Sequence, residues 1–316
     1  MRLNQRYLIV AIFLMIGGLL AAPSAACAQS NSYLKLDATR VSWAHLSFYA
    51  KNFWVEVSTD IQLGSITTSE LGAVLLHSPE GTPIKPATSE AIQMTINTTL
   101  DPSFRSPVNI YNRIWFNPTD ASALGRIRLR RGEDDFKKMY RFTEQGVFRH
   151  RMEPKDKDEA RLEPENWKDI KDSFYPYDLN RIGCPGVTER SVLIYIVSAA
   201  AALKISDPLS LCVFDKRQLH RVRLRHAGVS PIKVDYIEKR KKGEIRKQGI
   251  VKALKITLSS EPMESDLKTA ENFSFLGFHR NISLYLDPIS HLPVQASGTI
   301  PAVGNVHLKL QQTLMK

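Results

Sequence analysis

The sequence predicts a mainly β fold, a large curved antiparallel sheet or partial barrel with one buried apolar helix. Short segments in which apolar and polar residues alternate recur along most of the chain, separated by Gly, Pro, Asn and Asp. Helical patterning is almost confined to one segment, whereas a parallel α/β sheet needs a helix between most strands. The 316 residues are 43% hydrophobic and 24% charged, which is typical of a folded globular protein.

The first 28 residues have the layout of a secretory signal peptide. Arg2 and Arg6 form a positive n-region, an unbroken apolar run follows, and small residues around Cys27 indicate cleavage between Ala28 and Gln29. We therefore expect an exported, periplasmic protein with no transmembrane segment in the mature chain. Two alternatives stay open. One is an uncleaved membrane anchor, for which the apolar run is short; the other is a lipoprotein acylated on Cys27.

Most of the mature chain alternates with a period of two residues, which indicates strands with one buried face. In the first such segment, Val55, Val57 and Ile61 share a face with Phe53 and Leu63. Residues 138–143 and 146–152 are expected to form a hairpin that turns at 144–146. The predicted strands are 53–63, 92–97, 108–116, 126–130, 138–143, 146–152, 210–214, 219–226, 232–238, 250–258, 273–278, 282–286, 294–299 and 306–310.

One helix is predicted over about Thr188 to Lys204. Thr188 is a suitable N-cap, Glu189 suits the first turn, and residues 191–203 are apolar and rich in Ala. Because almost no face of this helix is polar, we expect it to be buried in the hollow of the sheet.

The charged stretch 154–178 divides the mature chain into two β regions, 29–153 and 179–316, and the second region contains the core helix. The stretch is expected to be a solvated linker, with a short helix over 165–174 as an alternative. The two β regions can also form one continuous sheet.

Two cysteines, Cys184 and Cys212, remain once Cys27 is removed with the signal peptide. In an oxidising compartment two such cysteines pair more often than they stay free. We predict a Cys184–Cys212 disulfide that fastens the region before the helix to the strand after it. The alternative is two unrelated buried thiols.

The segment 178–311 resembles a family of exported bacterial proteins known as domain of unknown function 3108. The resemblance lies in the apolar helix 191–203, the strand 219–224 and the strand–turn–strand 284–294, with Asp287-Pro288 and Leu292-Pro293 at its turn. The N-terminal half is similar through 140–143 and 146–147. The turn is also similar to one in the outer-membrane lipoprotein carrier fold, an open half-barrel with a helical plug. The resemblance implies an envelope location and a β-rich fold, and no activity.

No motif for catalysis, metal binding or a cofactor stands out. The eight histidines are scattered without a His-x-x-x-His spacing, and there is no Cys-x-x-Cys pair, nucleophile elbow or phosphate-binding glycine loop. We therefore expect a protein that is not an enzyme and has no metal or cofactor. A hydrolase built from distant residues, for example Asp287 with His291, stays open, although Asp-Pro is more simply a turn former.

Two predicted strands each present three arginines on one face: Arg126, Arg128 and Arg130 on the first, and Arg221, Arg223 and Arg225 on the second. Like charges at this spacing repel, so the rows need counter-charges. Either they pair with acids of the chain, such as Asp134, Asp135 or Asp235, or together they bind the phosphate or carboxylate of a ligand.

The chain has a net charge of +11, which becomes +9 once Arg2 and Arg6 are removed. Such an excess suggests anionic partners. Export and the lack of a motif argue against nucleic acid. The basic loop 239–242 adds attraction to an anionic membrane. We therefore expect a non-enzymatic envelope protein that binds a lipid or other amphiphilic anionic ligand in its curved sheet. The alternative is a docking module for another envelope protein, with a sealed core.

Overall fold

A 15-stranded sheet runs through the part of the chain that the computed structural model describes, residues 34–316 without 104, 201–207, 264–271 and 302. The predicted signal peptide, 1–28, and its cleavage site at Ala28 and Gln29 lie outside these residues. The first eight strands are β1 (Trp43–Lys51), β2 (Val55–Thr67), β3 (Glu90–Pro102), β4 (Val108–Phe116), β5 (Ala123–Arg131), β6 (Phe136–Phe142), β7 (Gly146–Glu153) and β8 (Asp169–Pro176). The others are β9 (Val187–Glu189), β10 (Leu209–Asp215), β11 (Gln218–Arg240), β12 (Gly243–Pro262), β13 (Arg280–Leu286), β14 (Pro293–Ile300) and β15 (Gly304–Met315).

The helices are few and short. Those described are α1 (Thr68–Val74), α2 (Leu179–Ile182) and α3 (Leu193–Ala199), with 3₁₀ turns η1 (Ala38–Arg40), η2 (Glu159–Arg161), η3 (Pro164–Asn166) and η4 (Arg190–Val192). No helix within the described ranges is long and apolar enough to cross a membrane. The mainly β fold class is therefore confirmed.

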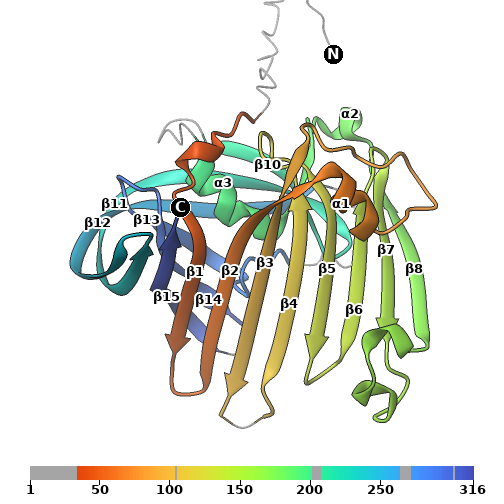
Figure 1. Ribbon diagram of the computed structural model, residues 1–316, viewed down its shortest axis with the longest axis horizontal. Coiled ribbons are helices and arrows are strands. Elements are labelled where there is room, and N and C mark those ends of the chain that lie inside the picture. The colour runs from red at the N-terminus through yellow and green to blue at the C-terminus, as the bar shows by residue number, and fades with distance from the viewer. Residues whose placement is uncertain (1–33, 104, 201–207, 264–271, 302) are drawn as a thin grey trace, which may run out of the picture. The chain divides into compact units, whose positions relative to one another are not determined.

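The strand order follows the chain in two directions from the pair β1–β15. Strands β1 to β8 form an antiparallel meander, and on the other side of β1 the order is β15, β14, β13, β12, β11, β10 and β9. Only the β9–β10 pairing in this order is parallel, and β11 makes an additional parallel contact with β15. The two β regions predicted from the sequence therefore belong to one sheet. Figure 1 shows β10 to β14 crossing behind the layer of β1 to β8.

The core lies between these two layers, around α3. Every side chain of α3 is buried, and the largest core cluster joins them to strands of both layers, for example Phe48 of β1, Phe116 of β4 and Leu284 of β13. The indole N–H of Trp43 donates to Ser198 Oγ at 3.2 Å. The helix thus fills the hollow of the sheet, as its apolar sequence predicts.

The start of the predicted helix is wrong. Thr188 does not cap it, because Val187–Glu189 forms β9 and pairs with β10. The Glu189 side chain instead accepts the Ser191 N–H and caps η4, and α3 begins at Leu193. The end expected near Lys204 lies outside the described residues.

Three further expectations need correction. The expected linker 154–178 includes β8, which pairs with β7 over its whole length, so the helix considered for 165–174 is absent from that stretch. Residues 273–278 form a turn with one isolated bridge between Phe275 and Phe278, and no strand. Phe53, expected on the buried face, lies in the β1–β2 turn and is 82% exposed.

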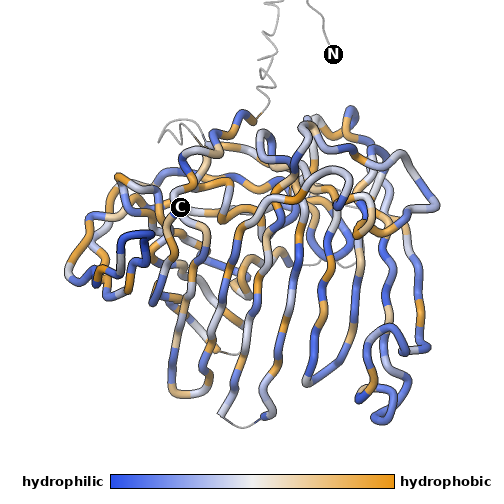
Figure 2. The backbone as a smooth tube through the Cα atoms, viewed as in Figure 1, coloured by the Kyte–Doolittle hydropathy of each residue, from blue (hydrophilic) through white to orange (hydrophobic). Residues whose placement is uncertain are grey.

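The disulfide between Cys184 and Cys212 is present, as predicted. It links the segment that follows α2 to β10. The predicted hairpin at 138–152 is also confirmed as β6 and β7. In Figure 2, hydrophilic residues recur along β5 to β8, so this end of the sheet is more polar than the region around α3.

Candidate anion-binding site

Four cationic side chains lie directly opposite one another across β5, β6, β7 and β8. Arg128 is opposite Lys138, Lys138 is opposite Arg151, and Arg151 is opposite Lys171. Directly opposed residues project from the same face of a sheet, so the four form one row across four strands, which we call the cation ladder. Like charges in this arrangement destabilise a sheet unless an anion neutralises them.

The ladder lies in a groove with a volume of about 580 Å³. The next row along the strands is Arg126, Tyr140, Arg149 and Ser173. We call the hollow the cationic groove; its lining residues are Arg126, Arg128, Arg130, Phe136, Lys138, Tyr140, Arg149, Arg151, Lys171, Ser173, Tyr175, Asp215, Lys216 and Arg217. Nine of these are Lys or Arg and one is acidic, so the groove repels cations and attracts anions.

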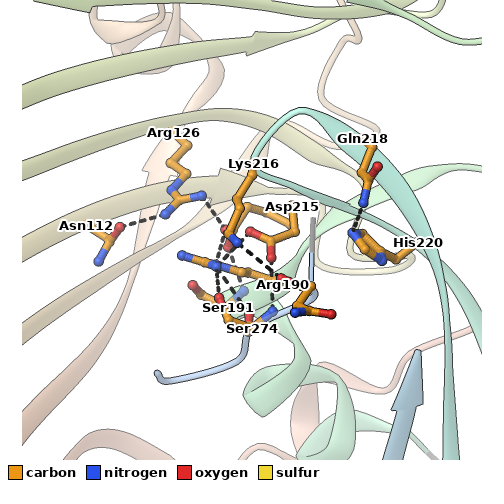
Figure 3. A network of polar contacts seen from close by, with 11 residues as sticks. Asn112, Arg126, Arg190, Ser191, Asp215, Lys216, Gln218, His220 and Ser274 are labelled. Carbon is orange, nitrogen blue, oxygen red and sulfur yellow. Dashed lines mark hydrogen bonds and ion pairs between the residues drawn. The ribbon is translucent and has the colours of Figure 1, made fainter. Parts of the chain in front are cut away.

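One wall of the groove is closed by a buried network of four charged residues. Arg126 Nη1 lies 2.7 Å from Glu189 Oε1, and Arg190 Nη1 lies 2.7 Å from Asp215 Oδ1. Arg190 is also 3.8 Å from Glu189. Figure 3 shows Arg126, Arg190 and Asp215 converging from β5, η4 and the end of β10. Two cations meet two carboxylates, so this ionic network is balanced and fastens the strands together.

The electrostatics of Arg190 support that structural role. Burial by itself disfavours the charged guanidinium, but the carboxylates of Asp215 and Glu189 outweigh it and raise the pKa of Arg190. Arg126 also donates to Asn112 Oδ1 at 2.9 Å. The charges of the network therefore neutralise one another, and none remains to bind a ligand.

The cations beyond the network are less well paired. In the described ranges, Arg128, Lys138, Arg149 and Lys171 have no carboxylate within ion-pair distance. Arg151 pairs with Glu153. The buried Nε atoms of Arg126, Arg128, Arg130, Arg149 and Arg151 are hydrogen-bonded to no described group. These unsatisfied donors add to the cost of crowding the cations in the empty groove.

Aromatic rings take the place of counter-ions. Lys138 Nζ lies 3.8 Å from the centroid of the Phe136 ring, and the guanidinium of Arg128 lies 5.4 Å from the same centroid. The guanidinium of Arg149 lies 5.2 Å from the centroid of Tyr175. Each such contact contributes only about 0.5–2 kcal/mol, which does not replace a counter-ion for a buried charge.

The pKa values show the cost of this crowding. Burial and two nearby arginines lower the pKa of Arg128 to about 9. Burial, followed by the charges of Arg151, Arg128 and Arg149, lowers the pKa of Lys138 to about 7. The groove therefore holds its central lysine at the edge of losing its proton when no anion is present.

Replacing Lys138 with Gln is expected to stabilise the ligand-free protein at pH 6–7. The pKa of Lys138 is lower in the folded state, so between about pH 7 and 10.5 the unfolded chain binds more protons and stability rises with pH. Below that window the full cost is present. We expect a gain of about 1–2 kcal/mol, well under the full shift because Lys138 is partly solvated. Urea unfolding at pH 6.5 and pH 9.5 measures the gain, which shrinks at the higher pH.

The control for this substitution is Lys252→Gln, which removes a charge from an exposed lysine of β12. It is expected to change stability by less than about 0.5 kcal/mol at both pH values. Equal effects of the two substitutions, or a destabilised Lys138→Gln at pH 6.5, would contradict the account of the groove.

The structure separates the two predicted arginine rows. Arg126, Arg128 and Arg130 line the groove. Arg221, Arg223 and Arg225 lie on β11 and are not among the lining residues of the groove. Arg223 pairs with Glu261 at 2.7 Å and Arg221 with the same carboxylate at 3.9 Å, while Arg225 is exposed. The second row thus fits the alternative of a sheet face paired with acids.

Part of the site was missed in the sequence. Lys138, Arg149, Arg151, Lys171, Lys216 and Arg217 line the groove and were not predicted. The signal for three of them was present, because the predicted hairpin that turns at 144–146 places Lys138 opposite Arg151 and puts Arg149 on the same face. The alternation of apolar and polar residues identifies the apolar face of a strand, but it does not identify a face that is cationic.

Neither of the other two chemistries considered gains support from the geometry. Asp287 accepts the N–H groups of Ile289 and Ser290 and the Ser290 hydroxyl, so its carboxylate caps a turn. The ring of His291 contacts Arg40, and burial lowers the pKa of His291. Within the described residues there is no cluster of His, Cys, Asp or Glu that could hold a metal ion.

Comparison with known proteins finds a similar structure of unknown function. No family model matches the chain, and no curated protein matches it. Among solved structures, it is similar to the crystal structure of a beta-barrel-like protein of domain of unknown function DUF1849 from Brucella abortus. The TM-score is 0.44 at 7% sequence identity, over 86% of this chain and 96% of the other. The resemblance to domain of unknown function 3108 stays a prediction.

Proposed function

We propose that this protein is a non-enzymatic periplasmic protein that binds the anionic group of a lipid or other amphiphile in the cationic groove. The observation that carries the proposal is the cation ladder, in which the largely buried Arg128 faces Lys138 without a carboxylate partner. A row of opposed cations costs stability in the empty protein, so a ligand that neutralises it gains that free energy on binding.

The lining of the groove suits an amphiphile. Phe136, Tyr140 and Tyr175 present ring faces beside the cations and offer apolar surface to the part of a ligand next to its charged head. The core around α3 is packed with the protein's own side chains. We therefore place the ligand in the groove and not in the apolar core.

One further observation supports binding rather than catalysis, and another supports a periplasmic location. Among the groove's lining residues, the single carboxylate, Asp215, is held by Arg190, so it is poorly suited to act as a base. The signal-peptide pattern and the resemblance to an exported family support the location.

The proposal is tested by flotation of vesicles made of phosphatidylcholine alone or with phosphatidylglycerol. The wild type is expected to bind only the anionic vesicles, more weakly as salt rises. Arg128→Gln/Lys138→Gln is expected to lose about 10-fold or more of this affinity. The matched control is Arg225→Gln/Lys252→Gln, which removes the same charge from exposed positions of β11 and β12. Equal binding by both double variants would reduce the effect to net charge and contradict the proposal.

A docking function is the second candidate, because the long β11–β12 hairpin exposes apolar side chains on one face. Val229, Ile237 and Ile250 are 56%, 38% and 75% exposed. The register places Ile250 opposite Lys233, on the face of Val229 and Ile237. Failure of the wild type to bind any anion would favour this candidate.

A further inference from the structure

We propose that the cationic groove binds ligands that carry at least two phosphoryl groups, one at each end of the cation ladder. This inference rests on the proposed function, since it concerns the same groove, and it goes further by fixing the number of anionic groups. The inner end is formed by Arg128 and Lys138 on β5 and β6. The outer end is formed by Arg151 and Lys171 on β7 and β8.

The length of the ladder is the first argument. Neighbouring strands lie about 4.8 Å apart, so four strands in register spread their cations over about 14 Å at the backbone. A phosphoryl group held between β5 and β6 lies about 12 Å from the backbone of β8 at this spacing. An anion held by Arg128 and Lys138 therefore leaves Lys171 available to a second group, together with the Nε group of Arg151, whose Nη2 pairs with Glu153.

The charge count is the second argument. Arg128, Lys138, Arg149 and Lys171 have no carboxylate partner within the described part of the chain. A single phosphomonoester carries about −1.5 to −2 at neutral pH, which neutralises about half of that charge. Two phosphoryl groups balance it.

The donor geometry is the third argument. Arg128, Arg149 and Arg151 each have a buried Nε that no described group accepts. Guanidinium groups bind phosphoryl and carboxylate oxygens in pairs through their fork of N–H donors. Phosphoryl groups fit better here because each offers three oxygens and up to two charges to cations from two strands. Lipid headgroups and soluble phosphates share this chemistry.

The asymmetry of the ladder assigns the two ends different roles. Lys171 is exposed on the edge strand β8, whereas Arg128 lies beside the ionic network and the Phe136 ring. The outer end can therefore be changed by mutation while Arg128 and Lys138 stay in place. Arg151→Gln/Lys171→Gln provides that separation, and the exposed pair Arg225→Gln/Lys252→Gln again serves as the matched control.

The experiment is calorimetric titration with orthophosphate, pyrophosphate, tripolyphosphate, fructose 1,6-bisphosphate and citrate. We expect at least one probe with two or more phosphoryl groups to bind about 10- to 100-fold more tightly than orthophosphate, and citrate to bind more weakly than that probe. Arg151→Gln/Lys171→Gln is expected to remove this advantage, so that it weakens the tightest multiply phosphorylated probe by a larger factor than it weakens orthophosphate. The control pair is expected to bind all probes as the wild type does.

A second arm identifies the source of the phosphoryl groups. Vesicles containing cardiolipin, with two phosphates per lipid, are compared with phosphatidylglycerol vesicles of equal total charge. Preference for cardiolipin supports a lipid headgroup, and tight soluble probes without that preference support a free phosphorylated compound.

Several results would overturn the inference and leave the proposed function standing. The first is that the affinities of all probes, citrate included, follow their total charge alone. The second is that Arg151→Gln/Lys171→Gln weakens orthophosphate and polyphosphate binding equally. The third is that no multiply phosphorylated probe or lipid binds more tightly than its singly phosphorylated counterpart. Absence of binding to every anionic probe and vesicle would overturn both. Circular dichroism of each variant, recorded first, confirms that the binding results come from folded protein.

Discussion

Glu189→Gln is expected to lower the free energy of unfolding by about 3–5 kcal/mol, the largest effect of any single substitution considered for this protein. Glu189 is fully buried and shares its carboxylate between Arg126 at 2.7 Å and Arg190 at 3.8 Å. Without that charge, two buried guanidinium groups share one remaining carboxylate, Asp215. Gln has the same shape and its amide oxygen can still accept the Ser191 N–H, so the substitution isolates the charge.

Urea unfolding at pH 7 measures this loss. The matched control is Glu261→Gln, which removes a carboxylate from an exposed pair with Arg223 and is expected to cost less than about 1 kcal/mol. Adding Arg126→Gln to Glu189→Gln is expected to recover part of the stability, because it removes the charge left unpaired. If Glu189→Gln lowered the free energy of unfolding by less than about 1 kcal/mol, water would already reach the charges of the network, and the account of a buried network would be wrong.

The network also bears on the groove, because Arg126 and Arg128 belong to the same strand, β5. Fixing Arg126 to β9 and η4 sets the position of β5 at the inner end of the ladder. At this end of the sheet, stability thus depends on Arg126 and ligand binding on Arg128, two residues further along the same strand. Arg126 is fully neutralised by the chain, and Arg128 is not.

Alternation predicted most of the strands because it records which residues face the core. It failed at β8, where Lys171, Ser173 and Tyr175 face the groove while Ile170 is exposed. A strand whose inward face is cationic has no apolar period and resembles a solvated linker. Helix-capping preference failed at Thr188, which suits a helix N-cap locally but lies in β9 because pairing with β10 prevails.

The groove could be predicted only in part for a similar reason. The rows on β5, β6 and β7 follow from two short hairpins, whose turns fix the register. Lys171 reaches the ladder across residues 154–168, a connection too long to fix a register. Asp215 at the end of β10 and Lys216 and Arg217 in the turn that follows reach the groove only because the sheet folds back on itself. No local pattern encodes that contact.

Removing the disulfide with Cys184→Ser/Cys212→Ser is expected to lower the free energy of unfolding by about 3–4 kcal/mol. The bridge closes a loop with a sequence separation of 28, so its loss returns that loop's conformational freedom to the unfolded chain. Anion affinity at 25 °C is expected to stay within about 2-fold of wild type, since neither cysteine lines the groove. Denaturant unfolding and the same titrations measure the two effects. If the folded double variant instead lost much of its anion affinity, the bridge would be required to hold Asp215, Lys216 and Arg217 in their binding positions.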